Sequence, residues 1–339
     1  MSDRLRLGIA VGYWGSQASD ATATVQAAER LGYETVWTAE AYGSDAFTPL
    51  AWYGARTSTI GLGTAVAQMS ARAPVTTAMH ALTLDHLSGG RAVVGIGVSG
   101  PQVVEGWYGA PFPRPLARTR EYLDIMRQVW RREAPVTSDG PHYPLPYPGG
   151  AGLGKPLKSI THPLRDRIPI YLGAEGPKNV ALATEIADGW LPLFYHPERS
   201  IPQYAEALAG AGPDFEIACT VTALVGDDVP GMLRLAKMPF AFYIGGMGAK
   251  EENFHLNVFV RMGFAEEGHK VQELFLAGRR EEAIDAVPDE LADGLSLVGP
   301  IARIKERLEP WRRSPVTTLN IAGVGDEPTL RAIRDAVLG

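Results

Sequence analysis

The sequence has a single cysteine, Cys219, so it can form no internal disulfide and no all-cysteine metal site. It also has no apolar run near the roughly 18 residues that a membrane-spanning helix requires. The opening residues MSDRLRLGIA lack the apolar core of a secretory signal peptide. These absences lead us to expect a cytoplasmic protein without a membrane partner.

An excess of basic residues is missing as well. The chain has 32 Lys and Arg against 38 Asp and Glu, a net charge of -6 and a pI near 5.7. A protein that binds nucleic acid through its phosphates usually displays a basic stripe, so we expect no nucleic-acid partner. The 7 histidines show neither His-Glu-x-x-His nor another metal-ligand spacing, and we therefore predict no metal site.

The composition is that of a globular protein with a large core, with 45% hydrophobic and 21% charged residues. Strand and helix patterns alternate along the chain. Alternating apolar residues over 5–11 predict a first strand, and the helix that follows is capped by Asp20 and ends near Leu31. Further strands are predicted at 35–38, 60–68, 92–98, 168–172, 189–194, 216–225 and 317–322.

This alternation favours an α/β fold, a single (β/α)8 TIM barrel over residues 1–339, although a doubly wound open sheet would show the same pattern. Two insertions interrupt it, one after the fourth strand and one after the seventh. Residues 139–169 are rich in proline and glycine and too long for an ordinary connection, which predicts a lid. Helical patterns fill about 229–292, interrupted by FYIGGMG at 242–248, which could line a pocket or a subunit contact.

A glycine turn joins the fifth strand to the next helix, in the stretch PIYLGAEGPKNVALATEIADGW at 169–190. Pro177 suits the first position of a helix because its φ is fixed and it has no N–H to leave unpaired. The N–H groups of the first turn, the close approach that Gly176 allows, and Lys178 together predict an anion site for a phosphate or carboxylate. An ordinary strand-to-helix turn is the alternative interpretation of the same residues.

In a parallel barrel the active site lies where the strands end. Asp85 and Arg91, on either side of the turn SGG, do not lie there and are interpreted as a structural ion pair. The side chains expected at the strand ends are Tyr13, Glu40, Gln68, Ser99, Glu175 and Phe194.

Four ordered stretches of the chain match one family. They are VWTAEAYGSDAFTPLAW, TLDHLSGGR, VVGIGVSGPQVVEGWYG and LGAEGPKNVALATEIADGW. Together they resemble the luciferase-like oxidoreductases that use a flavin or deazaflavin, and within these the coenzyme F420-dependent branch of actinobacteria. The resemblance covers nearly the whole chain. It implies a (β/α)8 barrel, a homodimer, and a cofactor at the barrel mouth with its phosphate at the turn after the fifth strand.

Carried to this sequence, the resemblance implies that the phosphate meets Gly176, Pro177 and Lys178, where the residues themselves predict an anion site. It also implies a non-proline cis peptide between Ala65 and Val66, although the residues alone would predict an ordinary trans strand. The other residues implied to border the cofactor are Gln68, Ser99, Gly100, Gly173, Ala174 and Glu175.

Glu40 matches an acidic residue that approaches the cofactor ring, so it would bind a ring hydroxyl, relay a proton, or only order its loop. Tyr13 is a candidate proton donor, with a pocket wall as the alternative. Ala41 stands where sugar-phosphate dehydrogenases of the branch have a histidine. Without that proton acceptor for neutral pH, glucose-6-phosphate oxidation is not expected.

These expectations favour an enzyme that passes a hydride between F420 and a small organic substrate, as a reductase of an activated C=C, C=N or C=O bond. Two alternatives remain open. An FMN-dependent luciferase-like monooxygenase would take reduced FMN from a partner reductase and use oxygen. A non-catalytic cofactor-binding barrel would bind F420 without turnover.

Overall fold

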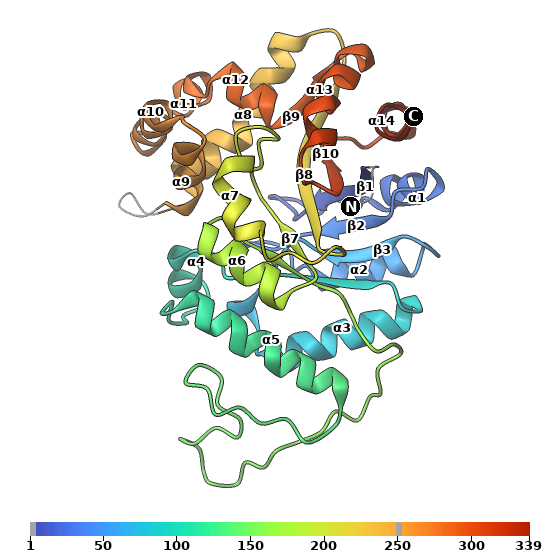
Figure 1. Ribbon diagram of the computed structural model, residues 1–339, viewed down its shortest axis with the longest axis vertical. Helices are drawn as coiled ribbons and strands as arrows, with labels where there is room; N and C mark the ends of the chain where they lie inside the picture. Colours follow the sequence, from blue (N-terminus) through green and yellow to red (C-terminus); the bar gives the residue numbers. More distant parts are fainter. Residues whose placement is uncertain (1–4, 249–252) are drawn as a thin grey trace.

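The computed structural model describes residues 5–248 and 253–339, and its centre is a closed sheet of parallel strands (Figure 1). The barrel strands are β1 (Arg6–Gly12), β2 (Thr35–Thr38), β3 (Gly61–Thr64), β5 (Ala92–Gly97), β6 (Ile170–Gly173), β7 (Gly189–Leu191), β8 (Glu216–Val225) and β10 (Thr318–Ala322). They are neighbours in this order, and β10 pairs with both β1 and β8. Because this pairing closes the sheet, the predicted (β/α)8 barrel is confirmed and the open doubly wound sheet is excluded.

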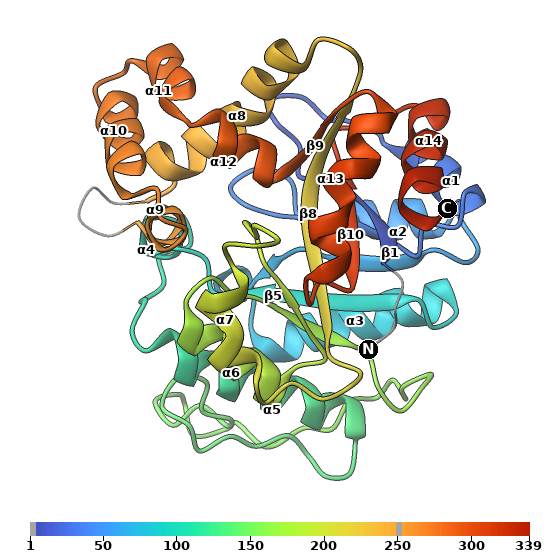
Figure 2. The same cartoon turned by 45° about the horizontal axis from the view of Figure 1, so that its top comes forward.

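Helices surround the barrel (Figure 2). Among them α1 begins one residue later than expected, so Asp20 accepts the N–H of Thr22 at 3.0 Å, and Ala21, not Asp20, is the N-cap. Within 5–248 and 253–339, none of the helices combines the length and apolar character that crossing a membrane needs. The helices that pack around the strands are α1 (Thr22–Arg30), α2 (Phe47–Gly54), α3 (Pro74–Ser88), α4 (Pro101–Gly106), α5 (Pro115–Arg131), α6 (Pro177–Ile186), α7 (Ile201–Leu208), α13 (Ile301–Arg313) and α14 (Glu327–Leu338).

The predicted third strand, residues 60–68, is broken in the middle. β3 pairs with β2 and β5, and after it the short strand β4 (Ala67–Gln68) pairs with β5 alone. Between them the peptide joining Ala65 to Val66 is cis, as the resemblance implied. Glycines leave room for the valine: a Cβ on Gly97 would lie 2.4 Å from Cγ2 of Val66, and one on Gly173 would lie 2.9 Å from its Cγ1.

The insertion after β8 is helical, as predicted, and has a core of its own. Phe194, expected at a strand end in the active site, is instead buried in this core against Phe240 and Phe259. The stretch at 242–248 does not interrupt the first helix, which continues to Gly246. The helices are α8 (Val229–Gly246), α9 (Phe254–Arg261), α10 (Ala265–Leu276), α11 (Arg280–Ala286) and α12 (Asp289–Gly294), with four residues, 249–252, outside the described part.

An additional strand, β9 (Ser296–Gly299), leads from the insertion back to the barrel. It pairs in parallel with the last residues of β8, from Thr222 opposite Ser296 to Val225 opposite Gly299. The sequence pattern did not predict it, although Asp293-Gly294 is a turn signal just before it, because a run of 4 residues is too short to be told from the end of the helical stretch. β8 therefore pairs with β10 in its first part and with β9 in its second.

Residues 139–169 connect α5 to β6 and lie on the side of the molecule opposite the insertion (Figures 1 and 2). The N–H of Tyr143 donates to Glu121 in α5 at 2.5 Å, and Arg165 pairs with Asp85 in α3 at 2.7 Å. The segment is thus fastened along two outer helices. None of these residues lines the cavity at the barrel mouth that is described in the next subsection.

Asp85 and Arg91 do not form the predicted ion pair. The carboxylate of Asp85, 1% exposed, accepts hydrogen bonds from Arg165 and from the N–H of Ala92. Arg91 extends to the turn before β3 and donates to main-chain oxygens there. Asp85 therefore pairs with Arg165, which lies in the segment 139–169. The residues whose carbonyl oxygens accept from Arg91 are Gly54, Thr57, Ile60 and Ser88.

Candidate functional site

A cavity of about 700 Å3 lies at the C-terminal ends of the barrel strands and reaches the helical insertion. Pro177, the exposed first residue of α6, is not among the residues that line it. The topology brings every other predicted cofactor or catalytic residue to the cavity. These residues are Tyr13, Glu40, Ala65, Val66, Gln68, Ser99, Gly100, Gly173, Ala174, Glu175, Gly176 and Lys178.

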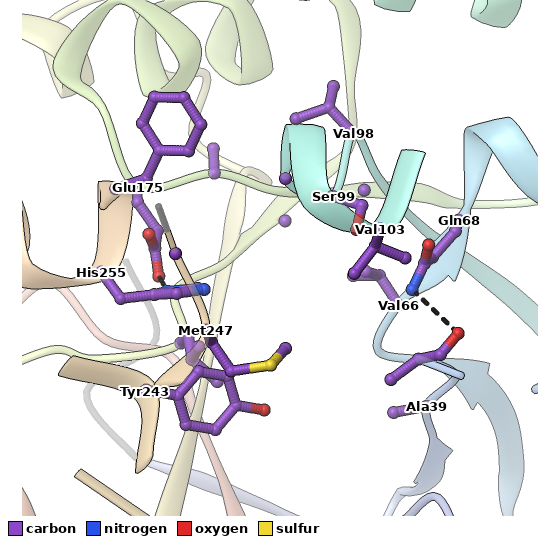
Figure 3. Close-up of a pocket in the computed structure, with 18 of the residues that line it drawn as sticks. Ala39, Val66, Gln68, Val98, Ser99, Val103, Glu175, Tyr243, Met247 and His255 are labelled. Atoms are coloured by element: carbon purple, nitrogen blue, oxygen red, sulfur yellow. Dashed lines mark hydrogen bonds and ion pairs between the residues drawn. The ribbon is translucent and has the colours of Figure 1, made fainter. Parts of the chain in front are cut away.

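Two facing walls form the cavity (Figure 3). The barrel wall carries Val66 after the cis peptide and Ser99 after β5. Ser99 has a φ of 60°, in the left-handed region that residues other than glycine rarely adopt, and it turns the chain from β5 into α4 at the cavity edge. The wall opposite carries Glu175, Tyr243, Met247 and His255.

The carboxylate of Glu40 is buried and fully engaged. Arg72 donates to both of its oxygens, at 2.6 and 2.8 Å, and the N–H groups of Gln68 and Ala46 donate to it at 2.6 and 3.2 Å. Burial alone would lower the pKa of Arg72, but the hydrogen bonds to Glu40 raise it above its ordinary value. Glu40 thus ties the end of β2 to α2 and to the segment after β4. This geometry favours ordering of the loops over proton relay.

Gln68 presents a hydrogen-bond acceptor beside this network. Its Nε2 donates to the main-chain oxygen of Glu40 at 3.1 Å. Its Oε1 is buried, and no partner for it occurs among the described residues. A buried polar atom left without a partner costs about 1 to 3 kcal/mol, so a ligand with an N–H group at this position would relieve that cost.

The turn after β6 offers fewer groups to an anion than the sequence suggested. Gly176 caps α6 with a φ of -79°, so the turn needs no left-handed residue here. The N–H groups of Asn179 and Val180 donate to the carbonyl oxygen of Gly176 at 2.9 and 3.0 Å. The N–H groups of Gly176 and Lys178 have no partner in the part of the chain that the structure describes, and the Lys178 side chain is exposed beside them.

A histidine that sequence reasoning missed faces the cavity from the insertion. The Nδ1 atom of His255 lies 2.7 Å from Oε1 of Glu175, and Figure 3 shows the pair on the wall opposite Val66. Asn253 caps α9 and accepts the N–H of His255 at 3.0 Å. The cap holds the first turn of α9, and hence the histidine, over the turn after β6.

Glu175 is also held through its main chain, by α9 again and by α7. Its main-chain oxygen accepts from Arg261 of α9 at 2.7 Å and from the hydroxyl of Tyr204 in α7 at 2.8 Å. Histidine and glutamate are 80 residues apart, so no local pattern could have paired them. The one available signal was Asn253, a residue type that favours helix starts, just before the histidine.

Tyr243, near the end of α8, completes this wall. Its ring lies 5.0 Å from that of His255, edge to face. Burial first, and then the neighbouring phenol of Tyr13, raises the pKa of Tyr243. Its hydroxyl therefore stays protonated, and Tyr13 reaches the same wall from the end of β1.

The family model for luciferase-like monooxygenases matches residues 5–318. The chain belongs to this luciferase-like family. A Mycobacterium tuberculosis protein named "Putative coenzyme F420-dependent oxidoreductase" is 54% identical over 331 residues, which cover 94% of this chain and 95% of that protein. The 5,10-methylenetetrahydromethanopterin reductase of Archaeoglobus fulgidus is 30% identical over 311 residues, covering 88% of this chain and 87% of that enzyme.

The fold of this chain is also similar to that of a solved structure. The coenzyme F420-dependent tetrahydromethanopterin reductase from Methanopyrus kandleri aligns with a TM-score of 0.80 over 98% of each chain, at 23% identity. At that identity the likeness establishes the fold alone. Active sites of such barrels lie at the mouth, where the strands end. The cavity of this protein lies there, and the cis peptide, Gln68 and the start of α6 all border it.

Proposed function

We propose that this luciferase-like protein is a coenzyme F420-dependent oxidoreductase that transfers a hydride from the reduced deazaflavin to a polarised double bond of a small organic substrate. The observation that carries the proposal is one cavity that joins Val66 after its cis peptide, the unpaired Oε1 of Gln68 and the start of α6. The 54% identity to the mycobacterial protein named for coenzyme F420 supports the choice of cofactor.

The residues present suit such a cofactor chemically. Oε1 of Gln68 is an acceptor for a ring N–H, and the Val66 side chain offers an apolar surface to a ring face. The N–H groups of Gly176 and Lys178, with the lysine ammonium, suit the phosphate of the cofactor tail. When bound, the reduced deazaflavin supplies the hydride. The protein holds the ring, excludes water and provides a proton.

The rest of the cavity favours an apolar substrate. Trp107, Phe112 and Phe254 line it near α4 and α9, and the two phenylalanine rings lie 6.4 Å apart. Reduction is the direction we propose, because the archaeal relative at 30% identity is named a reductase. We also propose a homodimer, as the family resemblance implies, and a place in the cytoplasm.

Anaerobic titration of the apo-protein with F420 and with FMN, followed by fluorescence, tests the choice of cofactor. We expect F420 to bind at micromolar concentration or below, and FMN much more weakly. Micromolar binding of FMN with none of F420 would overturn the proposal. It would favour the FMN-dependent monooxygenase, since the matching family model is described as a luciferase-like monooxygenase.

Turnover separates an enzyme from a non-catalytic cofactor-binding barrel. Reduced F420 is mixed with the protein and a panel of enones, imines and quinones without oxygen. Saturable reoxidation with any of them excludes the non-catalytic barrel. Tight F420 binding without reoxidation by any member would favour it.

A further inference from the structure

His255 is the histidine that lines the cavity in the described part of the chain. Its side chain is 21% exposed, and that of its partner Glu175 is 16% exposed. Both are therefore held by their surroundings and still open to a molecule in the cavity. The pair stands apart from Glu40, whose two oxygens are already taken.

The orientation of the imidazole is fixed on three sides. Nδ1 is bound to Glu175, the ring of Tyr243 packs at 5.0 Å and 78°, and that of Phe194 at 6.2 Å and 83°. An ionised carboxylate only accepts hydrogen bonds, so Nδ1 carries the hydrogen in this contact. Nε2 is then the atom left to exchange a proton, and Figure 3 shows the ring extending into the cavity.

Glu40, Lys178 and Tyr243, three other ionisable groups that line the cavity, are less suited to proton transfer. The carboxylate of Glu40 is engaged by Arg72, and Lys178 lies at the start of α6 beside the anion site. Burial raises the pKa of Tyr243 and makes it a weaker acid. Imidazole is the side chain that both gives and takes a proton near neutral pH.

We propose that His255 is the catalytic proton donor of the reaction and Glu175 its positioning residue, an inference that rests on the proposed function. The hydride bonds to the carbon of the C=X group, where X is oxygen, nitrogen or the distal carbon. The π electron pair moves to X, and X takes the proton from Nε2. The substrate gains two electrons and the reduced deazaflavin loses two. The imidazolium becomes neutral, and Nδ1–H remains bound to Glu175.

With His255 in this role, Ala41 does not leave the cavity without a proton-exchanging side chain. No histidine follows β2, but His255 of the insertion lines the same cavity. The sequence pattern around Ala41 gave no signal for this histidine. In the reverse reaction the neutral Nε2 of His255 would accept the proton from an alcohol or amine.

The first test requires no cofactor. Nitrogen NMR of 15N-histidine-labelled protein reports which ring nitrogen carries hydrogen, and His255→Gln assigns the signals. We expect the Nδ1–H form in the wild type and loss of this fixed form in Glu175→Ala. Unchanged His255 signals in Glu175→Ala would overturn the pair. In a pH series, the titration of neighbouring groups also affects the His255 signals. The titratable or charged groups around the ring are Glu175, Tyr13, Tyr42, Tyr243 and Arg261.

The second test follows reduced F420 with 2-cyclohexen-1-one as the probe. We expect kcat of His255→Gln to fall about 100-fold or more, with an F420 Kd near that of the wild type. Glu175→Gln should shift the pH profile of kcat, and added imidazole should restore part of the activity of His255→Ala. His269→Gln, exposed on α10, is the matched control with wild-type kinetics. Wild-type kcat in His255→Gln would overturn the assignment.

Failures of the two proposals are distinguishable. If the wild type binds no F420, the proposed function fails, and the NMR signals alone decide whether the pair exists. If it binds F420 but reduces no probe in the panel, the non-catalytic barrel is favoured and the proton-donor role is overturned.

Discussion

Arg72 donates to both carboxylate oxygens of Glu40, and the two side chains are only 12% and 3% exposed. The arginine follows the glutamate by 32 residues, so the pair joins the loop after β2 to the segment that leads into α3. Two charges held in this way depend on each other, because removal of one leaves the other buried and unpaired. The pair therefore links two segments that shape the cavity and holds them in place.

Arg72→Met is expected to lower the free energy of unfolding by about 3 to 5 kcal/mol, because Glu40 loses its partner inside the protein. Urea unfolding followed by circular dichroism measures the change. Arg120→Met breaks an exposed pair with Glu185 and is the control, with the midpoint of the wild type. An unchanged midpoint in Arg72→Met would contradict the buried pair.

Lys178→Ala is expected to weaken F420 binding about tenfold without abolishing it, since a charge-assisted contact contributes roughly 1.5 to 3 kcal/mol and less where it is solvated. The main-chain N–H groups at the start of α6 remain. Fluorescence titration at two salt concentrations tests this, and the difference should shrink at high salt. Lys270→Ala, exposed on α10, serves as the control. Wild-type affinity of Lys178→Ala at low salt would place the phosphate elsewhere.

Gly176→Val is expected to weaken F420 binding more than Lys178→Ala does, with only a small fall in the melting temperature. A Cβ at Gly176 meets nothing within 4 Å, so the fold admits the side chain, which then occupies the approach to α6. Gly97→Ala is the contrasting variant, because its Cβ would lie 2.4 Å from Cγ2 of Val66. Such overpacking costs about 1 to 3 kcal/mol and should lower the melting temperature. Similar melting of the two variants would refute the distinction.

His196 makes stability depend on pH. Burial, and then the charge of Arg199, lowers the pKa of His196 below its ordinary value of 6.5. Its Nδ1 accepts the N–H groups of Glu198 and Arg199 at 3.3 Å, which requires the neutral ring. The unfolded chain therefore takes up this proton near pH 6.5, and the folded chain only at lower pH. The contribution to stability is complete above pH 6.5 and is lost as the pH falls below it.

Urea unfolding at about pH 8, 6.5 and 5.5 measures this dependence. We expect a smaller loss between the two lower values in His196→Asn than in the wild type. Burial also lowers the pKa of His80, so part of the dependence of unfolding free energy on pH remains in the variant. Identical slopes for the two proteins would remove His196 from the explanation.

The sequence by itself determined the repeating part of this protein. The period of apolar residues located the barrel strands, and the end of each strand in a parallel barrel faces the same opening. That rule was enough to gather Tyr13, Gln68 and Ser99 in one cavity. The glycine turn and Pro177 located the start of α6 in the same way, because both act on the backbone within a few residues.

Only the tertiary structure decided which side chains meet across the chain. His255 reaches Glu175 because α9 lies over the turn after β6, and Asp85 meets Arg165, not Arg91, because the long loop passes along α3. The same path takes residues 139–169 away from the cavity. Periodicity specifies which face of an element is buried. It does not specify the partner, since the partner depends on how segments distant in sequence pack together.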